Sequence, residues 1–111
     1  MENGRVINIV ASECSPDQEI KFNKWYNEVH IPMLLEVPGL LGVTRYKLAG
    51  KVAGQAKYLA VYEFKDQASF EAFEQSPELG AARDEMSQTW KNGGLDIKWR
   101  APYESIKTWK K

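Results

Sequence analysis

The sequence predicts an α+β protein with the element order β-α-β-β-α-β, and three patterns indicate this class. Residues 5–13 and 57–64 carry β-branched and aromatic side chains at consecutive positions, as central strands covered on both faces do. Residues 16–30 and 67–90 carry apolar side chains at spacings of three and four, the period of an amphipathic helix. Residues 95–103 alternate apolar and charged side chains, which predicts a half-exposed strand.

The first helix is predicted to begin at "SPDQ" and to end near His30. Ser15 can cap the helix, and Pro16 suits its first position. Pro32 disfavours helical geometry in the residue before it and has no N–H to donate, so we expect the chain to bend there. The apolar stripe of this helix consists of Phe22, Trp25, Tyr26 and Val29.

The middle of the chain is predicted to form two strands joined by a turn. Residues 40–50 follow the Pro38-Gly39 turn signal and read as the second strand, and residues 51–56 connect it to the third strand, 57–64. The second helical region is predicted to break once, because Asp66 and Ser76 are each placed to cap a helix. On the third strand Tyr58, Ala60, Tyr62 and Phe64 share one face, and Leu59 and Val61 the other.

This element order is the ferredoxin-like plan, in which two helical regions cover one face of a four-stranded antiparallel sheet. The other face is then expected to be apolar, with Val6, Val10, Tyr58, Tyr62 and Phe64 on it or, in the alternative register, their neighbours. Burying such a face contributes on the order of ten kcal/mol before association costs, at about 25 cal/mol per Å². We therefore expect residues 1–111 to form one domain that pairs as a homodimer, a dimeric α+β barrel whose interior can hold a ligand.

Composition disfavours several classes of partner. Fifteen basic and fifteen acidic side chains cancel, so no net charge attracts nucleic acid or an anionic membrane. The C-terminal stretch "IKWRAPYESIKTWKK" is basic and contains tryptophan, but binding of single strands needs a charged groove along several elements. The sequence contains no run of eighteen apolar residues, so no membrane span is predicted.

Cysteine and histidine content bears on location and cofactors. A single cysteine forms no internal disulfide, which favours a reduced, cytoplasmic protein. One histidine and no cysteine cluster supply too few ligands for a metal site, and "GKVAGQ" lacks the spacing of a phosphate-binding loop. We therefore expect no metal and no cofactor.

The stretch "FNKWYNEVHIPMLLEVPGLLGVTRYKL" resembles the EthD-like branch of the dimeric α+β barrel superfamily. The shared features are the aromatic pair Trp25-Tyr26, then Glu28-x-His30, the Pro38-Gly39 turn and a strand with Arg45-Tyr46. The resemblance implies a small homodimer with a ligand pocket, in a family associated with catabolism of organic compounds and with ring-modifying steps of secondary metabolism.

Two departures from the family pattern bear on the substrate rather than on the fold. The aromatic order is Trp-Tyr where many relatives have Tyr-Trp, and Ile31-Pro32 stands in place of the commoner Gly-Pro. The superfamily also contains haem-degrading monooxygenases, which need an iron-ligating histidine on the second helix. Residues 67–90 contain no histidine, so we reject that function.

His30 is the candidate catalytic residue, because a histidine with its usual pKa can act as an acid or a base near neutral pH. The alternative is a structural role at the end of the helix, with a hydrogen bond to a carbonyl or a nearby carboxylate. Glu28 lies about 200° around the helix from His30 and is expected on the surface. Cys14 precedes a helix about 20 Å long, so the thiol and His30 cannot meet within one subunit.

Seven further residues are candidates for ligand binding. A polar amide at Asn8 within "VINIV" needs partners, and it can anchor a ligand or a water if it faces the barrel. An inward Arg45 would suit a carboxylate or phenolate, while the alternative is a solvated arginine beside packed aromatic rings. The aromatic candidates, which can equally be core residues, are Trp25, Tyr26, Tyr46, Tyr58 and Tyr62.

Two functions follow from these observations. The first is a small-molecule-binding homodimer that rearranges, dehydrates or cleaves an apolar or aromatic metabolite by cofactor-free acid/base chemistry at His30. The second is a binding or assembly module with the same barrel and no turnover.

Overall fold

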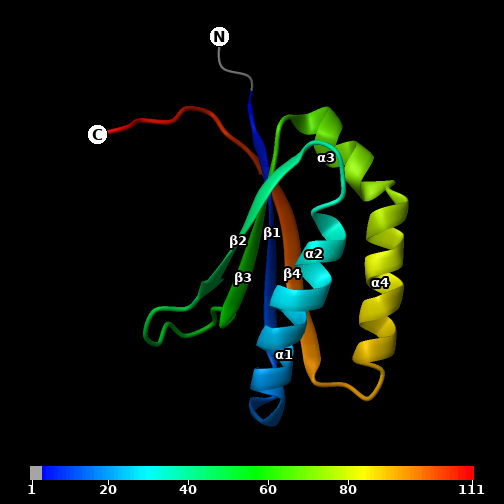
Figure 1. Ribbon diagram of the computed structural model, residues 1–111. Helices are drawn as coiled ribbons and strands as arrows, with labels where there is room; N and C mark the ends of the chain where they lie inside the picture. Colours follow the sequence, from blue (N-terminus) through cyan, green and yellow to red (C-terminus); the bar gives the residue numbers. More distant parts are fainter. Residues whose placement is uncertain (1–3) are drawn as a thin grey trace.

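The computed structural model describes residues 4–111 and has the predicted α+β order (Figure 1). One antiparallel sheet has the strand order β2-β3-β1-β4. Its strands are β1 (Val6–Cys14), β2 (Leu40–Lys47), β3 (Tyr58–Phe64) and β4 (Leu95–Glu104). The helices α1 (Glu19–Trp25), α2 (Ile31–Leu34), α3 (Gln67–Glu74) and α4 (Pro77–Thr89) all lie on one face of this sheet. The predicted ferredoxin-like order is therefore confirmed.

The first helical region does not end near His30, and this prediction is wrong. A 3₁₀ turn (Pro16–Gln18) leads into α1, a π-helical turn (Tyr26–His30) follows, and α2 continues the helix to Leu34. The Ile31 N–H donates to the Tyr26 carbonyl five residues back, which widens the helix just before Pro32. Pro32 then occupies the first turn of α2, where a missing N–H is tolerated.

The two predicted caps in the second helical region are confirmed. The Asp66 carboxylate accepts a hydrogen bond from the Ser69 N–H at 2.8 Å, at the start of α3. The Ser76 hydroxyl accepts from the Leu79 N–H at 3.1 Å, at the start of α4. These two side chains satisfy N–H groups that a helix start leaves free, and they explain the break between α3 and α4.

The sheet presents its aromatic face to the helices. On β1 the side chains of Val6, Asn8 and Val10 share this face, and their pairing partners on β3 include Tyr62 and Phe64. The expectation that the named set Val6, Val10, Tyr58, Tyr62 and Phe64 lines the uncovered face is thus wrong, and its register alternatives line that face instead. They are Ile7, Ile9, Leu59 and Val61, joined by the half-exposed Tyr46, Trp99 and Tyr103.

The uncovered face of the sheet is not closed by the C-terminal tail. Residues 105–111 extend from β4 on the side away from the helices (Figure 1). Within this tail Ile106 is 99% and Trp109 76% exposed, so the tail does not bury its own apolar side chains. Thr108 and Lys110 line a pocket with Ile7 and Tyr103, so the tail borders one end of the apolar face and no helix covers that face.

A β-bulge interrupts the predicted alternation along β4. Trp99 pairs with Ala11, but Ile97 pairs with Ser12, so Lys98 is an extra residue without a direct partner on β1. The bulge reverses the faces along the strand. Ile97 faces the helices, Trp99 faces away from them, and Arg100, opposite Val10, lies on the helix-covered side.

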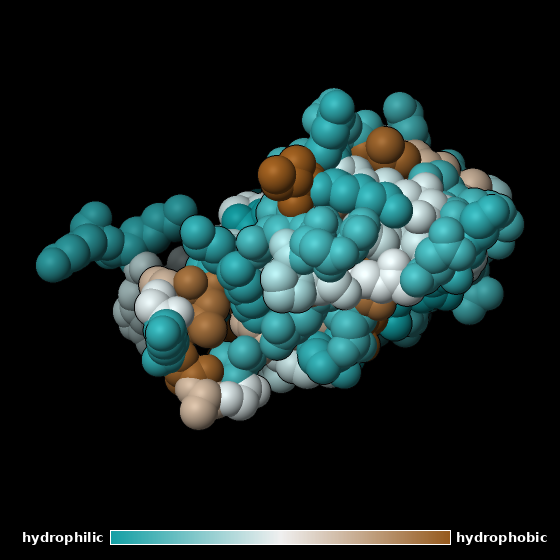
Figure 2. Space-filling model, turned by 90° about the horizontal axis from the view of Figure 1, so that it is seen from below, coloured by the Kyte–Doolittle hydropathy of each residue, from teal (hydrophilic) through white to brown (hydrophobic). Residues whose placement is uncertain are grey.

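No helix among residues 4–111 is both long and apolar enough to cross a membrane. Figure 2 shows the end of the molecule where α1 begins and where the β2–β3 connection lies. Hydrophilic side chains cover most of this end, and hydrophobic ones form separate small groups.

Candidate functional site

A small cavity lies between the helices and the sheet, and it collects most of the predicted site residues. Its volume is about 40 Å³, enough for one or two water molecules. Apolar side chains from α2, α3 and α4 line much of it, including Leu34, Phe73 and Met86. The polar side chains that line it are Asn8, Tyr26, His30, Tyr62, Arg83 and Arg100.

His30 is buried in this cavity, with only 8% of its surface exposed. Its imidazole stacks on the Trp25 indole, with 4.7 Å between ring centroids and 25° between planes. The edge-on ring of Tyr26 lies 5.2 Å away. The His30 Nδ1 atom is buried and has no hydrogen-bond partner among residues 4–111. An unpartnered ring nitrogen of this kind is available to a ligand or a water.

Burial lowers the pKa of His30 to about 4. The Glu85 carboxylate opposes this effect and raises the pKa, while the positive charge of Arg100 lowers it further. The imidazole is therefore neutral at pH 7, and one ring nitrogen can accept a hydrogen bond or a proton. The expected titration near neutral pH is not found, because the expectation rested on an exposed imidazole.

The orientation of Trp25 is set from α4. The Trp25 Nε1–H donates to Glu85 Oε1 at 2.8 Å, and the Thr89 hydroxyl makes a short hydrogen bond to Glu85 Oε2. Both carboxylate oxygens of Glu85 are thus occupied. The fixed indole provides the surface on which His30 stacks.

Two tyrosine hydroxyls lie on the same lining. Desolvation is the main cause that raises the pKa of Tyr26, and it raises the pKa of Tyr62 well above its usual value. A hydrogen bond between the two hydroxyls has the opposite effect on each, lowering the pKa of Tyr26 and raising that of Tyr62. Both groups therefore stay protonated at neutral pH and can donate hydrogen bonds. Asn8 lines the cavity from β1, on the helix side rather than inside a barrel between two sheets.

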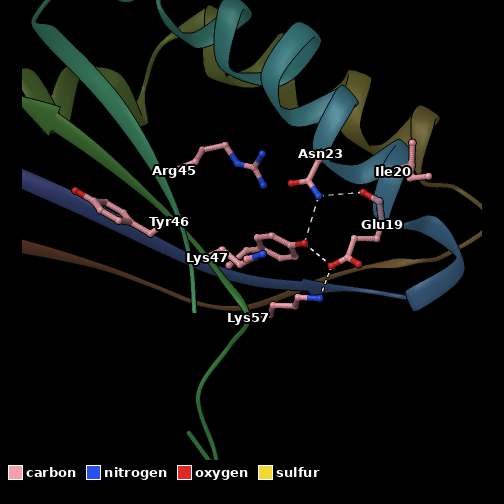
Figure 3. Close-up of a pocket in the computed structure, with 8 residues that line it drawn as sticks. Glu19, Ile20, Asn23, Arg45, Tyr46, Lys47 and Lys57 are labelled. Carbon is pink, nitrogen blue, oxygen red and sulfur yellow. Dashed lines mark hydrogen bonds and ion pairs between the residues drawn. The ribbon is translucent and has the colours of Figure 1, made fainter. Parts of the chain in front are cut away.

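Arg45 belongs to a second feature, a groove of about 630 Å³ between α1 and strands β2 and β3. Its guanidinium carbon lies 4.5 Å from the Tyr26 ring centroid, 5.3 Å from that of Phe22 and 5.5 Å from that of Tyr58. Arg45 Nη1 donates to Asn27 Oδ1 at 2.9 Å. Figure 3 shows the guanidinium turned toward the helix, so Arg45 is neither fully solvated nor inside the His30 cavity.

A polar network closes the other end of the groove (Figure 3). The Glu19 carboxylate pairs with Lys57 and accepts a short hydrogen bond from the Tyr58 hydroxyl. Asn23 Nδ2 donates to the Tyr58 hydroxyl at 3.2 Å. Hydrogen bonds from Lys57 and Tyr58 lower the pKa of Glu19. The donors and acceptors here already satisfy one another.

The structure thus separates the eight predicted residues into two sets. Those at the cavity are Asn8, Trp25, Tyr26, His30 and Tyr62, and those at the groove are Arg45, Tyr46 and Tyr58. Tyr46 points away from the other groove side chains, toward the uncovered face of the sheet (Figure 3). Glu28 is exposed, as predicted.

Sequence reasoning did not identify Arg83, Arg100 or Glu85. Arg100 was hidden by the apparent alternation of β4, which the bulge at Lys98 breaks. Ala82 belongs to the apolar stripe of α4, and Arg83 is the residue that follows it. No pattern in the sequence distinguished Arg83 from a solvated arginine. Among residues 4–111 there is no group of three His, Cys, Asp or Glu side chains placed to hold a metal ion.

The fold and cavity define the class: a ferredoxin-like protein with a small cavity, lined by both apolar and polar side chains, between its helices and its sheet. The chain belongs to the family described as Domain of unknown function (DUF4286), whose profile matches residues 5–98. A search of curated protein sequences gave no match.

Solved structures confirm the resemblance at the level of fold. An EthD family protein from Bacillus halodurans matches with a TM-score of 0.66 and 16% identity, over 93% of this chain and 99% of the other. A dimeric ferredoxin-like protein of unknown function from Jannaschia sp. matches with a TM-score of 0.65 and 17% identity, over 92% and 100%. SnoaB from Streptomyces nogalater, a cofactor-independent oxygenase, matches with a TM-score of 0.62 and 12% identity, over 95% and 94%.

Proposed function

We propose that the His30 cavity binds a small apolar or aromatic metabolite and that His30 acts on it as a general base, without a cofactor. The observation that carries the proposal is the buried, neutral imidazole with an unpartnered Nδ1. A buried polar atom without a partner destabilises the fold unless a bound ligand or water forms a hydrogen bond with it.

The tyrosines supply the complementary group. Removal of a proton from carbon beside a carbonyl places negative charge on the carbonyl oxygen. Because the Tyr62 hydroxyl donates to Tyr26, the protonated hydroxyl of Tyr26 is the one suited to donate a hydrogen bond to that oxygen. The proton taken by His30 returns to another carbon in an isomerisation, or leaves with a hydroxide as water in a dehydration. Neither step needs an oxidant or a reductant.

Ligand entry requires side chains to move. A space of about 40 Å³ does not hold an aromatic ring. Met86, Arg83 and Arg100 line the cavity from α4 and β4, and all three are long, unbranched side chains. Their rotation would enlarge the cavity without displacing a helix.

The uncovered sheet face supports a homodimer. Its apolar side chains lie on all four strands, and patches of this kind are seldom left exposed on monomers. Two of the similar solved proteins are described as dimeric ferredoxin-like proteins. Packing two such faces together is the arrangement we propose.

A non-catalytic binding module is the second candidate, and one observation favours it. A histidine with a pKa of about 4 is a weak base at pH 7 and removes only an acidic carbon-bound proton efficiently. The same neutral imidazole can hold a ligand by a hydrogen bond alone. The cofactor-free chemistry in the description of SnoaB supports the enzyme, although that likeness concerns fold only.

The experiment that separates the two begins with the ligand. The purified protein is incubated with a metabolite extract, and the small molecules that stay bound are identified by mass spectrometry. The bound compound is then mixed with wild type, His30→Gln and the exposed control Lys24→Ala. We expect a new product mass with wild type and Lys24→Ala and none with His30→Gln. Equal conversion by His30→Gln would remove His30 from the mechanism, and binding without conversion by any variant would favour the module.

A further inference from the structure

Two arginines from different elements converge on the His30 cavity. Arg83 projects from α4 and Arg100 from β4, and both line the cavity while remaining exposed. Neither forms a salt bridge with a described residue. Arg100 reaches this position because of the bulge at Lys98, and bulges beside functional sites commonly redirect a side chain.

The charge around the cavity is not balanced by the chain. None of the described lining residues carries a carboxylate. The nearest acidic group acting on His30 is Glu85, and both of its oxygens already accept hydrogen bonds, from Trp25 and Thr89. The exposed rim of the cavity, its mouth, is where Arg83 and Arg100 lie. Two guanidinium groups and one nearby carboxylate give this mouth a net positive charge.

Behind the arginines the cavity is apolar and aromatic, with one open acceptor. The walls include Trp25, Leu34, Phe73 and Met86. Among the described residues that line this cavity, the one buried side-chain nitrogen without a partner is His30 Nδ1, in a side chain that is 8% exposed. The cavity therefore combines positive charge at its mouth with apolar walls and a neutral imidazole inside.

We infer that the ligand is an apolar or aromatic carboxylate, whose carboxylate is held by Arg83 and Arg100 at the mouth while its apolar end enters toward His30. A planar guanidinium binds a carboxylate through two parallel hydrogen bonds, and two such groups fix the orientation of the ligand. The inference rests on the proposed function, because it assigns a substrate class to the same cavity.

The groove at Arg45 does not offer the same site. Its guanidinium already contacts three aromatic rings and donates to Asn27. Of the two lysines that also line the groove, Lys57 is paired with Glu19 (Figure 3). The arginines at the cavity lack comparable partners among the described residues.

The test uses benzoate and its neutral analogue benzamide, titrated at pH 7 into full-length, untagged protein. Because the chain contains one histidine, the ring signals of His30 report directly on the cavity in an NMR spectrum. We expect benzoate to shift these signals with a Kd about tenfold or more below that of benzamide. In the double variant Arg83→Gln/Arg100→Gln we expect the benzoate Kd to rise about tenfold and the benzamide Kd to change less than about twofold.

The matched control is Arg5→Gln, an exposed arginine that does not line the cavity. It should bind benzoate as wild type does. Circular dichroism of every variant confirms that the fold is retained. Equal Kd values for benzoate and benzamide in wild type would overturn the carboxylate inference while leaving the cavity as a binding site. Shifts at Asn23 and Arg45 without shifts at His30 would show binding in the groove instead. That result would overturn both the carboxylate inference and the cavity as the binding site.

Discussion

The His30 imidazole stacks on the Trp25 indole at 4.7 Å between ring centroids, and the indole itself is hydrogen-bonded to Glu85 on α4. The two rings are five residues apart and lie together because the π-helical turn spans Tyr26–His30. A regular α-helix would place residues five apart about 140° from one another. The wider turn returns them to the same side, and π-helical turns of this kind are frequent at functional sites.

Glu85→Gln should lower the pKa of His30 below that of wild type. The substitution removes the negative charge that favours the imidazolium but keeps an oxygen that can accept from the Trp25 indole. The pKa is measured from the His30 ring signals in NMR spectra. Glu74→Gln, an exposed position on α3, is the control and should leave the value unchanged. A higher pKa in Glu85→Gln would show that Glu85 does not act on His30 by its charge.

His30→Gln should flatten the pH dependence of stability between pH 6.5 and pH 4. The folded state binds the His30 proton only near pH 4, whereas the unfolded chain binds it near pH 6.5. The unfolded state therefore holds more protons in this window, and stability falls as the pH is lowered through it. The contribution is about 3 kcal/mol, present above pH 6.5 and lost by pH 4.

Urea unfolding of wild type and His30→Gln at pH 7 and pH 4.5 measures this difference. Carboxylates that titrate in the same range affect both proteins alike, so the comparison isolates His30. Parallel stability profiles for the two proteins would contradict a buried, neutral imidazole.

Arg45→Lys should destabilise the protein by about 1–2 kcal/mol. The guanidinium contacts the rings of Phe22, Tyr26 and Tyr58 and donates to Asn27, and an ammonium lacks the planar surface for these contacts. The free energy of unfolding in urea measures the loss. Lys47→Arg, on the same strand and exposed, is the control. A change below about 0.3 kcal/mol in Arg45→Lys would show that the stacking contributes little.

Val61→Lys should convert the proposed homodimer to a monomer. Val61 lies on the uncovered face of the central strand β3, and a charge there would be buried without a partner in a face-to-face dimer. Light scattering at micromolar concentration should give twice the chain mass of 12.7 kDa for wild type and one chain mass for the variant.

The control for this experiment is Ile20→Lys, because Ile20 is 88% exposed on α1 and lies on the helix side of the molecule. This variant should remain dimeric. A wild-type mass equal to one chain would contradict the dimer, and the apolar face would then need another partner.

The element order was predictable because each element carries a strong local signal. The β-branched run of β1, the aromatic run of β3 and the caps at Asp66 and Ser76 act over a few residues and do not depend on the rest of the fold. The end of the first helix was not predictable in the same way. Pro32 normally stops a helix, and only the widened turn before it allows continuation.

The candidate site was predictable in part. Trp25 and Tyr26 lie on one helical stripe, so their proximity followed from spacing, whereas His30 joins them only through the π-helical turn. Asn8 and Tyr62 share one face of paired strands. The face itself was not determined, because a strand apolar on both sides fits either register. The position of Arg100 at the cavity depends on one extra residue in β4, and that of Arg83 depends on the tertiary packing of α4. Neither position can be predicted from the local sequence pattern.

The pKa of His30 in the untagged wild-type protein tests the central claim most directly, since the proposed chemistry requires a buried imidazole that is neutral at pH 7. An NMR titration of its ring signals from pH 8 to pH 3 provides the value. We predict a midpoint at about 4. A midpoint near 6.5, the ordinary value for histidine, would show a solvated side chain and would contradict the cavity as the functional site.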